Sequence, residues 1–210
     1  MLGIVVASSA ALLTACGGGS SGEGDVTGTY HAQVVTAAFP TGQSLGQTSL
    51  LRLGIRNTGD KKIPTLAVTI SVEGGEGQAS TLPFGFRDPQ PGLAQPDRPV
   101  WVLAAGYPKR AGDPSPGGAT TSNAKTFSLG ALKPGATTEW VWKVSAVEAG
   151  AHTLLYRVGA GLNGAAKVKT AAGVVPGGSF AVNISTSPPD TIVTDSGEVV
   201  PIGKAKPQKP

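Results

Sequence analysis

The stretch Leu51–Gly59 (LRLGIRNTG), followed by Ile63–Val72 (IPTLAVTISV), decides the fold. Period-two alternation of apolar with polar or small residues predicts two strands, each with one buried face. The intervening residues 57–62 (NTGDKK) combine Asn, Gly and Asp, which favour turns. We therefore expect two strands joined by a hairpin-like corner. The apolar positions of the two runs are Leu51, Leu53, Ile55, Leu66, Val68, Ile70 and Val72.

A second pair of alternating segments lies toward the C-terminus, at 139–144 (EWVWKV) and 152–158 (HTLLYRV), with a turn at 145–151. No segment after Cys16 has a sustained helical period. The chain is therefore predicted to be all-β, an antiparallel sandwich of short strands. Further strands are expected near 29–37, 99–104, 125–129, 165–169 and 179–185.

The N-terminal part has a different character. An uncharged apolar run, Leu2–Ala15, ends at Cys16, the only cysteine, and a Gly/Ser-rich segment follows. The run is shorter than the roughly 17–25 residues of a membrane span and suits the apolar region of a signal peptide. A single cysteine excludes an internal disulfide. Secretion with a free thiol, or a buried helix with a core cysteine, are the alternative interpretations.

Composition narrows the function classes. The net charge is +4, and 14% of residues are charged. A nucleic-acid reader would show a dense basic stripe with interleaved aromatic residues, and this sequence has none. With His31 and His152 as the only histidines and one cysteine, the ligands of a tight transition-metal site are lacking. We expect no nucleic acid, metal or cofactor.

The segment 78–123 departs from a minimal sandwich because it is long, proline-rich and aromatic. Loops of this length without secondary structure are uncommon unless they are functional or disordered. One hypothesis is a recognition surface of aromatic and arginine anchors. The favoured alternative is a loop whose aromatic side chains cap the core, with 99–103 as a strand. The candidate partner-binding residues are Phe84, Phe86, Arg87, Trp101, Tyr107 and Arg110.

A hydrolase motif is a minor hypothesis. Residues 42–46 (GQSLG) match the G-x-S-x-G pattern, which needs a strand-to-helix turn that exposes the serine. Here a strand is expected to follow, and His152 is the only candidate base downstream of Ser44. His152 shares a strand face with Leu154 and Tyr156, which favours a packing role. We therefore expect no catalytic residues.

Two resemblances follow from these residues. The order of apolar run, Thr14-Ala15-Cys16 and flexible spacer resembles a bacterial lipoprotein signal, which implies cleavage before Cys16 and acylation of its thiol. The units 51–72, 129–135 (LGALKPG), 138–142 (TEWVW) and 149–153 (AGAHT) resemble bacterial immunoglobulin-like modules of the CARDB and conserved-repeat type. That resemblance implies an immunoglobulin-like antiparallel β-sandwich with one long Pro/Gly-rich insertion and disordered termini.

The predicted organisation has four parts. Residues 1–15 are a signal peptide, 16–27 a lipid-anchored linker, 28–186 the sandwich with its insertion at 78–123, and 187–210 a flexible basic tail. The resemblances imply an extracytoplasmic, lipid-anchored and non-catalytic module that binds a protein or polysaccharide of the envelope. The alternative function is a structural spacer or an assembly subunit of an envelope complex.

Overall fold

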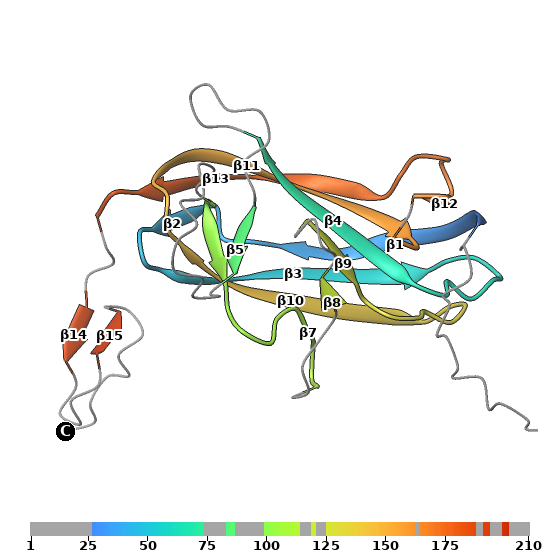
Figure 1. Ribbon diagram of the computed structural model, residues 1–210, viewed down its shortest axis with the longest axis horizontal. Helices are drawn as coiled ribbons and strands as arrows, with labels where there is room; N and C mark the ends of the chain where they lie inside the picture. The colour runs from blue at the N-terminus through green and yellow to red at the C-terminus, as the bar shows by residue number, and fades with distance from the viewer. Residues whose placement is uncertain are drawn as a thin grey trace, which may run out of the picture.

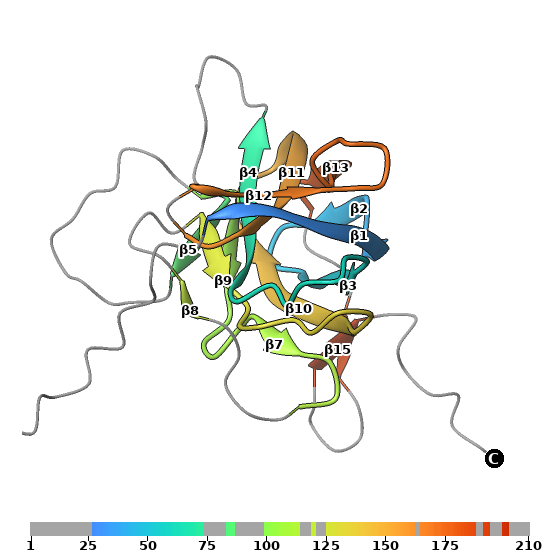
Figure 2. The ribbon, with the colours of Figure 1, turned by 90° about the vertical axis from the view of Figure 1, so that its right-hand side faces the viewer.

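The computed structural model describes residues 27–73, 83–86, 99–113, 119–120, 125–162, 164–187, 191–193 and 199–201. Every regular element within these ranges is a β-strand, so the predicted all-β class is confirmed. The strands form two packed layers, with β12, β11, β4 and β13 in one, β3, β10 and β7 in the other, and β1 between them (Figure 2).

The first layer, here called the β10 layer, is centred on two long antiparallel neighbours, residues 48–57 and 137–146. It comprises β1 (Gly28–Ala38), β3 (Thr48–Asn57), β5 (Phe84–Phe86), β6 (Trp101–Leu103), β7 (Lys109–Arg110) and β10 (Thr137–Ala146). β3 lies between β1 and β10, and both β6 and β7 pair with the other edge of β10. The pairing of β1 with β3 shifts register between Val34 and Thr36, which marks a bulge in this edge strand.

The second layer, the β11 layer, is centred on residues 150–160. It comprises β2 (Gly42–Ser44), β4 (Leu66–Glu73), β8 (Ala119–Thr120), β9 (Thr126–Ser128), β11 (Gly150–Ala160), β12 (Ala166–Lys169) and β13 (Gly177–Ser185). β4 pairs with one edge of β11, and β13 and β12 pair with the other. The first residues of β1 pair in parallel with β12, so β1 joins the two layers (Figure 1).

The expected hairpin between residues 51–56 and 66–72 is wrong. β3 and β4 lie in different layers, as do β10 and β11, so each corner crosses the core instead of closing a hairpin. The reason is physical: each of these strands carries an apolar face, and placing consecutive strands in opposite layers turns both faces toward one core. The turn residues are compatible with either arrangement.

Asn57 organises the first of these corners. Its side chain is fully buried and its Nδ2 donates to the carbonyls of Lys61 (2.8 Å) and Leu132 (3.0 Å). Its Oδ1 accepts from the amide of Gly59 at 3.0 Å. Its backbone also pairs with the turn before β10, because Asn57 N donates to Ala136 O and Asn57 O accepts from Gly135 N, both at 2.9 Å. One asparagine therefore ties the β3–β4 corner to the turn that starts β10.

The core lies between the two layers and contains part of the 78–123 insertion. Trp101 is fully buried on β6, where its ring meets Phe39 (5.5 Å between centroids) and His152 (6.0 Å) edge-on. The indole Nε1 of Trp101 donates to Gln43 Oε1 at 2.9 Å. Phe84 of β5 is also buried and contacts Phe127 at 6.1 Å. The alternative expectation, that insertion aromatics cap the core, is confirmed for Phe84 and Trp101.

Near the C-terminus, β14 (Thr191–Val193) and β15 (Val199–Pro201) pair with each other as a two-stranded sheet. The apolar pairs at 192–193 and 199–200 therefore form a small ribbon, where the sequence predicts a flexible tail. The predicted signal peptide, residues 1–15, and residues 16–26 of the predicted linker lie outside the described residues.

Replacing Asn57 with Ala should lower the free energy of unfolding by about 2–4 kcal/mol. The substitution removes the three hydrogen bonds of the Asn57 side chain, each worth about 0.5–1.5 kcal/mol, although Leu132 O keeps its bond from Ile63 N. Chemical denaturation measures the change, with Thr58→Ala, an exposed neighbour, as the matched control. A loss below about 0.5 kcal/mol, the range of ordinary surface substitutions, would show that the corner does not depend on Asn57.

Candidate functional site

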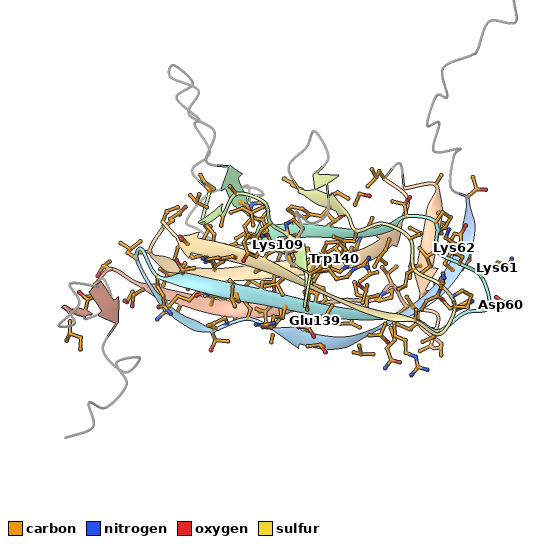
Figure 3. The ribbon with its side chains drawn as sticks, turned by 90° about the horizontal axis from the view of Figure 1, so that it is seen from below. Asp60, Lys61, Lys62, Lys109, Glu139 and Trp140 are labelled. Carbon is orange, nitrogen blue, oxygen red and sulfur yellow. The ribbon has the colours of Figure 1, made fainter. Side chains whose placement is uncertain are left out.

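The predicted partner-binding residues do not form one exposed surface. Phe84 and Trp101 belong to the core, so their assignment to a binding surface is corrected. Tyr107 is half-buried against the core, and its ring lies 5.3 Å from Lys109 Nζ. Arg110 is exposed, with its guanidinium 5.5 Å from the ring of buried Trp140 (Figure 3 labels Lys109 and Trp140). Cys16, Arg87 and the side chain of Phe86 lie outside what the structure describes.

The geometry around Ser44 differs from that of a nucleophile elbow. Ser44 lies on β2, whose three residues pair in parallel with the end of β13. Its amide donates to Gln47 Oε1 at 2.9 Å, and its hydroxyl accepts from Ser185 at 3.3 Å. His152 is buried in the core, where neither ring nitrogen has a hydrogen-bond partner. The residues of the minor hydrolase hypothesis are therefore not joined in a catalytic pair.

A broad hollow lies on the outward face of the β11 layer. We call it the β11 groove, a cavity of about 960 Å³. Because β4, β11 and β13 are paired in register, their outward side chains form rows across the sheet. One row is Thr69, Arg157 and Gly177; the next is Ser71, Leu155 and Ser179. Glu73 borders the groove and also a smaller hollow of about 260 Å³ near Thr153 and Asn183.

One wall of the groove is the turn between β12 and β13. This turn is held by backbone hydrogen bonds from Thr170 N to Val174 O (2.8 Å) and from Gly173 N to Thr170 O (2.9 Å). It carries Val174 and Val175, which are 61% and 51% exposed. Two exposed valines on an ordered turn present an apolar edge beside a floor of hydroxyls and charges.

Two glycines of β13 keep the floor of the groove low. A Cβ at Gly177 would lie 2.5 Å from the carbonyl oxygen of Tyr156, and one at Gly178 would lie 2.7 Å from its hydroxyl. A side chain at Gly177 would therefore force β13 away from β11, and one at Gly178 would displace the Tyr156 ring. Tyr156 covers Gly178 and stacks on Phe180, with 5.6 Å between ring centroids. Burial raises the pKa of the Tyr156 hydroxyl.

The groove combines donors and acceptors with an apolar edge. Arg157 supplies a guanidinium, Glu73 a carboxylate, and Ser71 and Ser179 supply hydroxyls, whereas the hydroxyl of Thr69 contacts that of Thr126 at 3.0 Å. The two charges are opposite, so the lining is neutral overall. Such a surface is suited to binding an uncharged polar ligand. Among the described residues, no three side chains of His, Cys, Asp or Glu gather as a metal site.

Sequence reasoning missed this groove for a physical reason. Its residues are the outward-facing members of alternating strands, which read as ordinary solvent-exposed positions. A weak signal was present in β13, where Gly177, Gly178 and Ser179 are unusually small for consecutive strand residues.

The structure is an all-β fold of two packed layers, and comparisons with solved structures give broad similarities. A CARDB domain from Pyrococcus furiosus, crystallised with di-metal ions, has 10% identity and a TM-score of 0.37, covering 77% of this chain and 95% of that one. A fragment of Escherichia coli alpha-2-macroglobulin has 15% identity and a TM-score of 0.41, covering 80% of this chain and 21% of that one. A protein that catalyses macrocyclization in alchivemycin A biosynthesis has 10% identity and a TM-score of 0.42, covering 74% and 89%.

No protein-family profile and no curated protein sequence matches this chain. The identities of these solved structures are too low to define its family. Within the described ranges, no helix has the length and hydropathy needed to cross a membrane.

Replacing Tyr156 with Phe should reduce the loss of stability at high pH. Because burial raises the pKa of the folded hydroxyl, the unfolded state loses its proton first as pH rises above about 10, the ordinary tyrosine value. The folded state therefore becomes less favoured in the wild type, whereas the Phe variant has no such group. Urea unfolding at pH 8 and pH 11 measures how much the free energy of unfolding falls in the wild type and in the Phe variant. Equal losses in the two proteins would contradict the assignment.

Proposed function

We propose that this chain is a lipid-anchored, non-catalytic binding module of the bacterial envelope, with the β11 groove as its binding site. The anchor is Cys16, acylated after removal of residues 1–15. The observation that carries the binding role is the groove itself, which combines an ordered apolar edge with hydroxyls and two opposite charges. Its lining includes Glu73 and Arg157 but no histidine or cysteine, which supports recognition more than catalysis.

The chemistry of the groove favours a saccharide chain over a peptide. The floor lies on the face of a paired sheet, so the backbone groups of β11 are already bonded to β4 and β13. An extended peptide gains most of its affinity from main-chain hydrogen bonds to a free sheet edge. Both edges of β11 are already paired, so the groove has no free edge of β11 for a peptide to bind. A saccharide brings its own hydroxyls to Ser71, Ser179 and Arg157, and its C–H faces can pack on Val174 and Val175.

A structural spacer or assembly subunit is the second candidate. The observation that favours it is the burial of Phe84 and Trp101, which removes two of the aromatic anchors expected on the 78–123 surface. Hot spots of protein interfaces are enriched in exposed aromatic and arginine residues. Under this hypothesis the chain acts by holding other components at a distance from the membrane.

Co-sedimentation of the purified protein with isolated envelope polysaccharide tests the groove. Arg157→Ala and the double substitution Val174→Ser/Val175→Ser should each weaken retention by about tenfold, because each removes a distinct part of the lining. Arg52→Ala is the matched control, since Arg52 is an arginine on the outward face of the other layer, 3.2 Å from Glu139. Equal retention of all variants would contradict the proposal that the β11 groove is the binding site, and would favour the structural-spacer hypothesis.

Replacing Cys16 with Ala tests the anchor separately. After a wash at about 0.5 M salt, which screens exposed charges, the variant should leave the membrane fraction, because it lacks the two long acyl chains that hold the wild type at the bilayer. Fractionation followed by intact-mass measurement gives the result, and the wild-type mass should include the acyl groups. Membrane retention of the Ala variant at the wild-type level would contradict lipid anchoring.

A further inference from the structure

The end of the sandwich that carries the start of β1 is built from loops distant in sequence. We call it the basic tip, and it consists of residues 28–31, 56–65, 130–137, 161–162 and 164–167. The loops are bonded together: Thr58 N donates to His31 O (3.0 Å), and Gly161 N donates to Thr65 O (2.8 Å). Ile63 and Leu132 also exchange hydrogen bonds, each 2.9 Å long. The tip is therefore one connected surface.

The charges of this surface are strongly asymmetric. Five exposed basic residues lie on it, against one exposed acid among its described residues, Asp60. The tip therefore carries a net charge equal to the +4 of the whole chain. Figure 3 shows Lys61 and Lys62 at the same end as the start of β1. The basic residues are Arg56, Lys61, Lys62, Lys133 and Lys167.

An exposed leucine accompanies these charges. Leu162 is 44% exposed and lies in the short loop between β11 and β12. The loop turns sharply because Gly161 and Gly164, on either side, have positive φ angles of 73° and 74°. An exposed leucine in a surface turn does not add to solubility. Basic residues around an exposed apolar side chain are typical of surfaces that bind anionic bilayers.

The chain geometry points in the same direction. β1 begins at Gly28, and Cys16 precedes it by a Gly/Ser-rich segment. The residues between Cys16 and Gly28 can span at most about 40 Å even when fully extended. A lipid on Cys16 would therefore hold this end, and not the end with β2 and the β10–β11 turn, within reach of the headgroups.

We propose that the basic tip docks on an anionic phospholipid surface, with the lysines and Arg56 against the headgroups and Leu162 inserted between them. This inference rests on the proposed envelope location of the chain, but it does not require that Cys16 be acylated or that the groove bind a ligand. Docking of this end would fix the orientation of the long axis of the sandwich relative to the bilayer.

Vesicle co-sedimentation of the full chain carrying Cys16→Ser tests the tip without the lipid. The probes are vesicles of phosphatidylcholine alone and vesicles with about one-third phosphatidylglycerol. Binding should require the anionic lipid and fall when salt is raised from 0.05 M to about 0.5 M, because exposed charges are then screened. Lys61→Glu/Lys62→Glu should weaken binding by about tenfold or more, and Leu162→Ser should weaken it severalfold.

The matched controls lie at the other end of the sandwich. Lys143→Glu and Val147→Ser change an exposed lysine and a valine that is 48% exposed, and both should bind as the parent does. Thermal unfolding checks that every variant is folded. Equal binding to both vesicle types, or no effect of the Lys61/Lys62 reversal, would overturn the proposal. If vesicle binding is lost with Lys61→Glu/Lys62→Glu but not with Leu162→Ser, the proposal would also be overturned, and the tip would be a binding surface for a soluble polyanion.

Discussion

The buried side chain of Asn57 is the constraint on which the two-layer arrangement depends. It stands where β3 leaves one layer and the chain crosses to β4 in the other, and it bonds both to that crossing and to the turn before β10. A carboxylate or an aliphatic side chain cannot both donate and accept in this place. The apolar faces of β3 and β4 meet across the core, and the bonds of Asn57 satisfy backbone groups at the corner where the chain crosses between the layers.

The insertion between β4 and β9 contributes to the same core. Trp101 closes the space between the layers on the β6 side, and its indole N–H is bonded to Gln43 from the opposite layer. Gln43 in turn donates to Pro40 O at 2.9 Å, which fixes the path from β1 to β2. A buried indole needs a partner for its N–H, so the short strand β2 has a packing role although it contributes only three residues.

Alternation predicted the long strands well, because β3, β4, β10 and β11 each present one apolar face over eight or more residues. It could not predict which strands pair, since the turn chemistry of 57–62 is the same for a hairpin and for a crossing between layers. It also missed β2, β5 and β7, since two or three residues are too few for a period. The groove escaped notice because Gly177 and Ser179 matter through the space they leave, which sequence patterns do not record.

The dual pairing of β1 has a mechanical consequence. Its first four residues run parallel to β12, and its later residues pair with β3 in the other layer. A pull on the chain from the N-terminal side acts along these strands, so the ladder hydrogen bonds are sheared together and do not open one at a time. Resistance to such a force is set by the rate of forced unfolding and not by equilibrium stability. The first strand of the described chain is therefore held by both layers.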